Sequence, residues 1–265
     1  METEHFKRSV MPILIKIRSL FLLLILAGYC SPSFSAECVV LLHGLARTAS
    51  SMEALETKLS SEGFYVANID YPSREMTIEA LSELAIAQGI EGCKKAKASP
   101  INFVTHSLGG ILVRQFYKTN QQEDLKRVVM LGPPNKGSEV VDNLKDVPGF
   151  EFYNGPAGMQ LGTGENDVPK RLGPVNFDLG VIAGTRSINF ILSRYLPDPD
   201  DGKVSVASTK VEGMCSFLTL PVSHTFMMSD DDVIVEVIEF LKSGAFVHVD
   251  ALNFCGSSMQ ASRKF

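Results

Sequence analysis

Residues 104–110, which read VTHSLGG, join a β-branched run to an amphipathic stretch. A serine at such a junction lies in a tight strand-to-helix turn, so we expect the hydroxyl of Ser107 to project at the carboxyl end of the strand. The amide of Leu108 and the positive end of the following helix then point to the same place. Gly109 relieves crowding in the turn, whereas Thr105 stands where a glycine is usual. The alternative, a serine that only caps a helix, fits this placement less well than a nucleophile does.

Short β-branched runs alternate with longer amphipathic stretches on both sides of this turn. The pattern predicts an α/β fold, namely a doubly wound, mostly parallel sheet with helices on both faces. The expected elements are strand 39–43, helix 50–61, strand 64–69, a helix from 78 towards 93, strand 101–105, helix 108–117, strand 127–131, strand 181–184, strand 217–222 and helix 231–241. Residues 135–179 lack such a period and are too long for an ordinary connection, so we expect a cap or lid insertion there.

The composition is that of a globular protein. Of the 265 residues, 45% are hydrophobic and 21% are charged, and this length suits one large domain better than two. The formal net charge is −5 and the sequence shows no basic patch, so nucleic acid is not expected as a partner.

The amino terminus differs from the rest of the chain. Basic residues precede an apolar run over residues 20–28, and small residues follow at Ser33, Ser35 and Ala36. This order predicts a secretory signal peptide over residues 1–35, a single domain over residues 36–265, and an exported protein, either periplasmic or secreted. The sequence leaves two alternatives open, which are an uncleaved membrane anchor counted from Ile13 and lipidation at Cys30.

Removal of the leader leaves four cysteines, Cys38, Cys93, Cys215 and Cys255, in a chain bound for an oxidising compartment. Strand starts and helix ends gather at the same edge of a parallel sheet, which places Cys38 with Cys93 and Cys215 with Cys255. We therefore predict these two disulfides. Four buried thiols that pack as small hydrophobic side chains are the alternative.

An oxyanion needs a second amide besides the one that follows the nucleophile. Residues 43–45, which read His-Gly-Leu, end the first expected strand. Gly44 lets the backbone turn there, so that the amide of Leu45 can point into the site. Leu45 and Leu108 are therefore the predicted oxyanion donors, and His43 is structural on this interpretation.

The serine also needs a base and a carboxylate that orients the base. His224 follows the last expected apolar strand at the catalytic edge, whereas the other four histidines lie in the leader, the two turns and the tail. Residues 198–204, which read DPDDGKV, supply three acids. We choose Asp201 because the glycine after it permits a sharp loop, and Asp200 is the runner-up. The resulting order along the chain is serine, aspartate, histidine, one of three common triad orders.

Several segments resemble the α/β-hydrolase superfamily, and the resemblance extends over essentially the whole mature length. Within that superfamily the chain looks most like bacterial lipases and lipase-like esterases related to GPI inositol-deacylases. The segments that carry the resemblance are residues 39–45, 104–110, 131–138 and 201–204, the last of which looks like the acid loop of such lipases. Two residues depart from the group: Thr105 replaces the usual glycine, and Asn135 stands where these lipases often have histidine.

The resemblance implies a lipase-like hydrolase of carboxylic esters that works by acyl transfer on Ser107, His224 and Asp201, without a cofactor. The implied partner is a small ester or lipid substrate, with transient contact to a membrane or lipid surface. An acyltransferase or a thioesterase would use the same triad, and a catalytically inactive binding module is the alternative from a different class. No metal site is predicted, because the cysteines lack close metal-binding spacing and the histidines do not cluster in the sequence.

Overall fold

The computed structural model describes residues 35–120 and 124–255. The expected signal peptide lies outside these residues except for Ser35, and so do Ile13 and Cys30, the two positions on which the alternatives for the amino terminus depend. From Ala36 onward the described residues form one unit.

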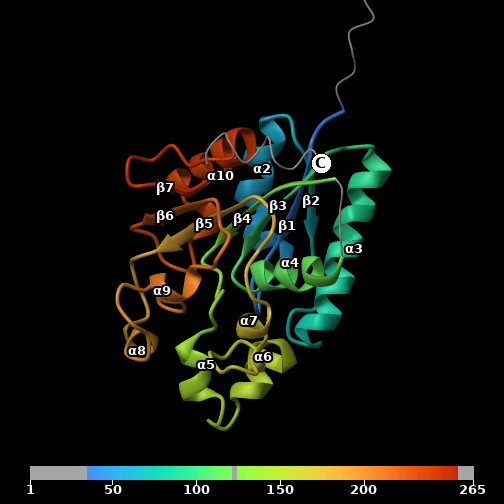
Figure 1. Ribbon diagram of the computed structural model, residues 1–265. Helices are drawn as coiled ribbons and strands as arrows, with labels where there is room; N and C mark the ends of the chain where they lie inside the picture. Colours follow the sequence, from blue (N-terminus) through green and yellow to red (C-terminus); the bar gives the residue numbers. More distant parts are fainter. Residues whose placement is uncertain (1–34, 121–123, 256–265) are drawn as a thin grey trace, which may run out of the picture. The chain divides into compact units, whose positions relative to one another are not determined.

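Seven strands form one sheet in the order β2-β1-β3-β4-β5-β6-β7 (Figure 1). The first six pair in parallel, whereas β7 runs antiparallel to β6. The strand bounds are β1 Cys38–Leu42, β2 Tyr65–Ile69, β3 Ile101–His106, β4 Leu125–Leu131, β5 Leu179–Gly184, β6 Ser216–Leu220 and β7 Leu252–Asn253. The mostly parallel sheet predicted from the sequence is therefore confirmed.

Helices cover both faces of the sheet, because successive side chains of each buried strand point to opposite faces. In β1, Val40 and Leu42 join the cluster that packs against α3 and α4, whereas Val39 and Leu41 join the cluster that packs against α2 and α10. The four helices are α2 Glu53–Ser61, α3 Ile78–Ala96, α4 Leu108–Thr119 and α10 Asp231–Ser243. Their bounds lie close to those expected from the apolar spacing, so the doubly wound arrangement is confirmed as well.

The connection between β4 and β5 holds more regular structure than the sequence predicted. It contains three short helices, α5 Glu139–Leu144, α6 Phe150–Met159 and α7 Val168–Arg171. Gly155, with φ of 65°, and Pro156 interrupt α6, so no continuous helical period runs through this segment. Figure 1 places these helices beyond the carboxyl ends of the strands.

The sequence analysis also missed several very short elements. These are η1 Ala49–Met52, α8 Phe190–Ser193, α9 Val206–Thr209, η2 Met227–Ser229 and the strand β7. Each has four residues or fewer, which is too short for a hydrophobic period to appear.

Two disulfides join the pairs of cysteines predicted from the sequence, Cys38 to Cys93 and Cys215 to Cys255. The alternative of four free thiols is therefore wrong. Both bridges fit an extracellular or periplasmic protein. Over residues 35–120 and 124–255, no helix has the length and apolar character needed to cross a membrane.

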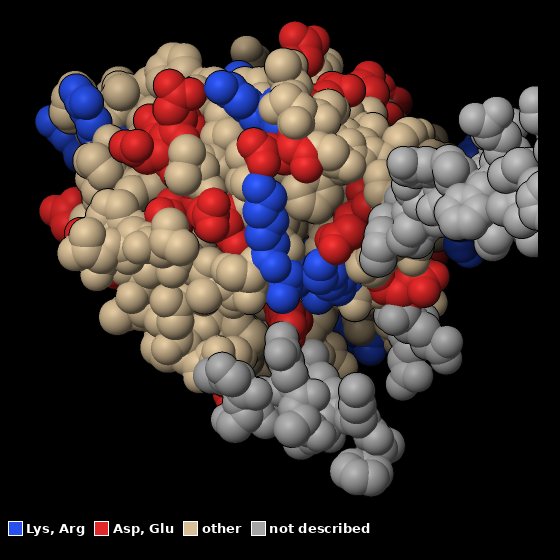
Figure 2. Space-filling view, turned by 90° about the horizontal axis from the view of Figure 1, so that it is seen from above, with Lys and Arg blue, Asp and Glu red and all other residues tan. Residues whose placement is uncertain are grey.

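Acidic and basic side chains are mixed on the face seen from above in Figure 2. Near the amino ends of the strands, Lys126 pairs with Glu37, and Lys242 pairs with Glu62. Two local pairs of opposite sign thus lie at this end of the sheet.

Candidate active site

Ser107 forms the turn between β3 and α4 with φ of 52° and ψ of −117°, a strained backbone conformation for a residue with a side chain. Its amide donates to the carbonyl oxygen of Leu131 at the end of β4, at 2.9 Å. Gly109 lets α4 approach the sheet closely, because a Cβ there would lie 2.7 Å from the carbonyl oxygen of Leu42. This is the geometry of a strand-to-helix turn that presents a nucleophile.

The turn after β1 lies at the same edge and is held by His43. The amide of Tyr71 donates to His43 Nε2 at 3.3 Å, so Nδ1 carries the proton and donates to the carbonyl oxygen of Gly44 at 2.9 Å. The rings of His43 and Tyr71 stack with their centroids 4.0 Å apart. Burial lowers the pKa of His43, which keeps the ring neutral. This side chain is therefore structural.

Two amides at this edge are available to an oxyanion. Leu45 follows the His43 turn, and in the described part of the chain its amide donates to no acceptor. Leu108 is the first residue of α4, where an amide has no acceptor within the helix. These are the two donors chosen from the sequence.

Asp201 and His224 are in direct contact. Asp201 Oδ2 lies 2.7 Å from His224 Nδ1, and both side chains are buried. The other carboxylate oxygen accepts the amides of Lys203 at 2.9 Å and Val204 at 2.8 Å. The amide of His224 donates to the carbonyl oxygen of Asp201 at 2.9 Å. A carboxylate fixed in this way orients an imidazole and stabilises its charged form.

Of the two acids considered from the sequence, the structure brings Asp201 and not Asp200 to His224. Asp200 Oδ1 instead accepts the hydroxyl of Ser193 at 2.7 Å. The contact of Asp201 also depends on Gly132, at the end of β4, since a Cβ there would lie 3.0 Å from Asp201 Oδ2.

His106 makes a contact that the sequence did not reveal. Its Nε2 lies 3.0 Å from the carbonyl oxygen of His224, so Nε2 carries the proton and donates. The two rings have centroids 4.7 Å apart. Burial, followed by the nearby His224, lowers the pKa of His106 well below 6.5. A neutral His106 therefore helps to hold the loop that carries His224.

Ser107 and His224 line one cavity of about 230 Å³. Its apolar wall includes Val140, Val141, Leu144, Phe150, Leu161 and Leu192, most of which come from the connection between β4 and β5. In the described residues the hydroxyl of Ser107 makes no hydrogen bond to His224. The arrangement can therefore enclose an apolar chain beside a serine, an imidazole and two free amides.

The chain is similar to known hydrolases. Residues 38–167 match the family model of palmitoyl protein thioesterase. A lipase of Bacillus licheniformis in its mature form is 17% identical, with a TM-score of 0.61 over 81% of this chain and 94% of that chain. Lipase B of Aspergillus fumigatus is 15% identical, with a TM-score of 0.60 over 80% of this chain and 55% of that chain. No curated protein sequence matches the chain.

The sheet order, the serine turn and these similarities define an α/β-hydrolase fold. Over residues 38–167 the chain is similar to palmitoyl protein thioesterases, and its fold is similar to those of the two lipases. The fold implied by the resemblance is thus confirmed.

Proposed function

We propose that the protein hydrolyses carboxylic esters through an acyl-enzyme on Ser107, with His224 as the base and Asp201 as the acid that orients it. The observation that carries this proposal is the buried contact of 2.7 Å between His224 Nδ1 and Asp201 Oδ2. The same imidazole lines the cavity that contains the strained Ser107. A serine hydroxyl becomes a useful nucleophile when such a base can take its proton.

In the first half-reaction, Ser107 Oγ bonds to the carbonyl carbon while His224 Nε2 takes the hydroxyl proton. The carbon–oxygen bond to the leaving group then breaks, and His224 returns the proton to the leaving alcohol. The amides of Leu45 and Leu108 donate to the oxyanion. A water deprotonated by His224 then attacks the acyl-enzyme, releases the carboxylic acid and restores Ser107. The bond from Ser107 to His224 closes on substrate binding, as hydrogen bonds of this kind often do.

Labelling with a fluorophosphonate probe tests the nucleophile. Ser107→Ala is expected to abolish labelling and to lower kcat/KM on nitrophenyl esters by about a thousandfold or more. Ser138→Ala is the matched comparison, because Ser138 lines the same cavity but donates its hydroxyl to the carbonyl oxygen of Lys203. Labelling that persists in Ser107→Ala and disappears in Ser138→Ala would overturn the assignment.

The family match favours a second candidate, a thioesterase on the same residues, since residues 38–167 match the palmitoyl protein thioesterase model. The first half-reaction is shared, so the leaving group decides between the two activities. An oxyester and a thioester with the same acyl chain, assayed side by side, separate them. Product analysis with an added alcohol identifies an acyltransferase.

Contact with a lipid surface is part of this proposal. Helix α6 contributes two residues to the cavity wall and α8 contributes one, and both helices also expose large apolar side chains. Phe152 is 90% exposed, Phe190 is 78% exposed and Ile191 is 72% exposed. Exposed apolar groups beside a cavity suit transient binding to lipid. The two disulfides support export to the periplasm or the medium.

A further inference from the structure

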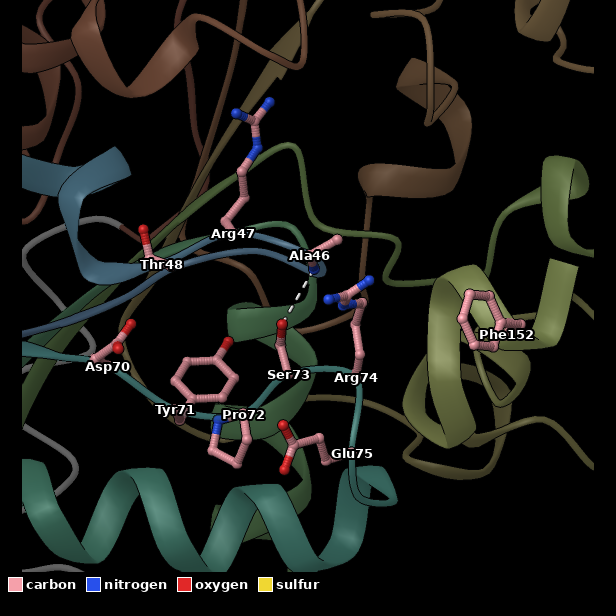
Figure 3. Close-up of a pocket in the computed structure, with 10 residues that line it drawn as sticks. All are labelled: Ala46, Arg47, Thr48, Asp70, Tyr71, Pro72, Ser73, Arg74, Glu75 and Phe152. Carbon is pink, nitrogen blue, oxygen red and sulfur yellow. Dashed lines mark hydrogen bonds between the residues drawn. The ribbon is translucent and has the colours of Figure 1, made fainter. Parts of the chain in front are cut away.

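A second pocket, of about 660 Å³, adjoins the catalytic cavity and is shown in Figure 3. Its walls come from the turn after β1, from the loop after β2 and from Phe152 of α6. Arg47 lines both spaces, and Leu45 of the catalytic cavity directly precedes Ala46 of the second pocket. A substrate bound at Ser107 can therefore extend into this pocket.

The walls of the second pocket are held by several contacts. The amide of Ala46 donates to Ser73 Oγ at 3.0 Å, the bond drawn as a dashed line in Figure 3. The hydroxyl of Tyr71 donates to the carbonyl oxygen of His43. Helix α6 lies directly against this loop, because a Cβ at Gly155 would lie 1.8 Å from the carbonyl oxygen of Arg74. The pocket is thus formed before any ligand binds.

Two arginines, Arg47 and Arg74, line the pocket, and in Figure 3 the guanidinium of Arg47 points away from that of Arg74. In the described part of the chain neither makes an ion pair. Figure 3 shows the side chain of Arg74 directed towards Ala46, at the end of the pocket that adjoins the catalytic cavity. An anion at this end would meet donors that can bind it in a bidentate manner.

The two acidic residues of the pocket are placed differently. Asp70 lies at the end away from Arg74 in Figure 3, where its Oδ1 accepts the amide of Ala49 at 2.9 Å. The carboxylate of Glu75 points away from the guanidinium of Arg74 in the same view. Arg74 and Ala46 therefore lie together at the end of the pocket that adjoins the catalytic cavity.

The positive charge of Arg47 also reaches the catalytic cavity. Burial lowers the pKa of Lys203, and the charge of Arg47 lowers it further, whereas Asp201 opposes the change. Both cations line the cavity that contains Ser107. Positive charge therefore extends from the pocket lined by Arg47 into the catalytic cavity.

We propose that the pocket lined by Arg47 and Arg74 receives the leaving group of the substrate, and that this leaving group carries a phosphate. The inference rests on the proposed function, because the leaving group is the part of the substrate that is released when Ser107 takes the acyl group. The acyl chain then occupies the apolar cavity, and the phosphate-bearing alcohol or thiol lies across Arg47 towards Arg74. The preferred substrates are acyl esters or thioesters of such compounds.

Matched substrate pairs test the inference. Hexanoyl glycerol 3-phosphate is compared with hexanoyl glycerol, and the hexanoyl thioester of coenzyme A with that of N-acetylcysteamine. Within each pair the reacting bond is of the same kind and the phosphate is present or absent. The wild type is expected to prefer the phosphate-bearing member of one pair, and the pair concerned identifies a lipid or a nucleotide-linked thiol as the source.

The ratio of kcat/KM within the preferred pair is the readout for variants. Arg74→Gln is expected to lower this ratio by about fivefold, as for loss of one exposed ionic contact, and Arg74→Glu to lower it further. Lys58→Gln on α2 is the matched control, because Lys58 is exposed and lines neither cavity. It is expected to leave the ratio unchanged.

Two outcomes contradict the inference in distinguishable ways. If the wild type hydrolyses the neutral members in a manner that depends on Ser107, but shows no preference for phosphate in either pair, the leaving-group site is overturned and the proposed function stands. If it hydrolyses no member of either pair, the proposed function fails and the leaving-group site fails with it. A ratio equal in Arg74→Glu and the wild type also overturns the assignment of Arg74.

Discussion

Asp200 and Asp201 are neighbours in the chain, but their carboxylates have different partners: Asp201 contacts His224, and Asp200 accepts the hydroxyl of Ser193. Asp201→Asn removes the charge that supports a protonated His224, so kcat is expected to fall by about ten-thousandfold at neutral pH. Asp200→Asn is the control, because an amide oxygen can still accept from Ser193; its kcat should stay within a few-fold of the wild type. Steady-state assays on one nitrophenyl ester check both. A larger loss in Asp200→Asn than in Asp201→Asn would reverse the assignment.

His106 makes stability depend on pH. Burial lowers its pKa in the folded protein well below 6.5, so below about pH 6.5 the unfolded chain binds a proton that the folded chain does not. Its contribution is therefore complete above about pH 6.5 and is lost as the pH falls. His106→Phe is expected to reduce the fall in unfolding free energy by up to about 1.4 kcal/mol per pH unit. Urea denaturation at pH 7.5 and 5.5 measures the unfolding free energy of both proteins. An equal fall in unfolding free energy between the two pH values in His106→Phe and the wild type would refute the prediction.

The sequence indicates candidate residues for the site. It does not readily indicate the contacts that these residues make. Asp201 was distinguished from Asp200 by the glycine that follows it, a local property of the chain. The bond from His106 to His224 spans 118 positions, and no local pattern predicts it. Arg47 likewise looks like a solvated loop residue until the fold places it between two cavities. Contacts between distant loops depend on the folded backbone and are therefore missed.

Among the elements, α4 is tied to the connection between β4 and β5 by Arg114. This buried guanidinium donates to Asn135 at its carbonyl oxygen and Oδ1, and to the carbonyl oxygens of Pro169 and Gly173. Burial lowers the pKa of Arg114 to about 10, which leaves it charged at neutral pH. Asn135, the departure from the lipase pattern, thus has a structural partner here.

Arg114→Met is expected to lower the unfolding free energy by about 2–4 kcal/mol, because several buried acceptors lose a charged donor together. Lys118→Met, one turn further along α4, is the matched control. Lys118 also donates to a carbonyl oxygen, that of Arg171, but in an exposed position, where such a bond contributes little. Chemical denaturation of both variants tests this. Equal losses would mean that burial of the guanidinium does not matter.

Hydrophobic periodicity identifies the long helices and buried strands but not the short helices between β4 and β5. Strands β1, β3 and β5 are buried on both faces, and β1 appears in the sequence as a continuous apolar run. Helix α5 has six residues, and α6 is broken at Gly155. Several of their apolar side chains line the catalytic cavity and others are exposed, so too few of them repeat at helical spacing.

At the scale of the whole molecule, the candidate site residues and the disulfides lie at opposite ends of the strands. Ser107, Asp201 and His224 follow carboxyl ends of strands or the loops beyond them, whereas Cys38 begins β1 and Cys215 directly precedes β6. The first six strands are parallel, so all of their carboxyl ends lie on the same side. The loops that carry these three residues therefore lie at the end of the sheet away from both disulfides.

The two disulfides are expected to contribute unequally. Cys38 and Cys93 are fully buried and join β1 to the end of α3 across 55 residues, so replacing both by alanine should lower the unfolding free energy by about 4 kcal/mol. Cys215 and Cys255 span 40 residues, a loop of similar length, yet Cys255 belongs to the segment after α10. That segment can detach while the sheet stays folded, so the corresponding double variant should lose clearly less.

Urea denaturation of both variants, with the wild type in reducing buffer as the reference for loss of both bridges, measures the difference. Nearly equal losses, as chain entropy alone predicts, would show that the tail unfolds together with the core.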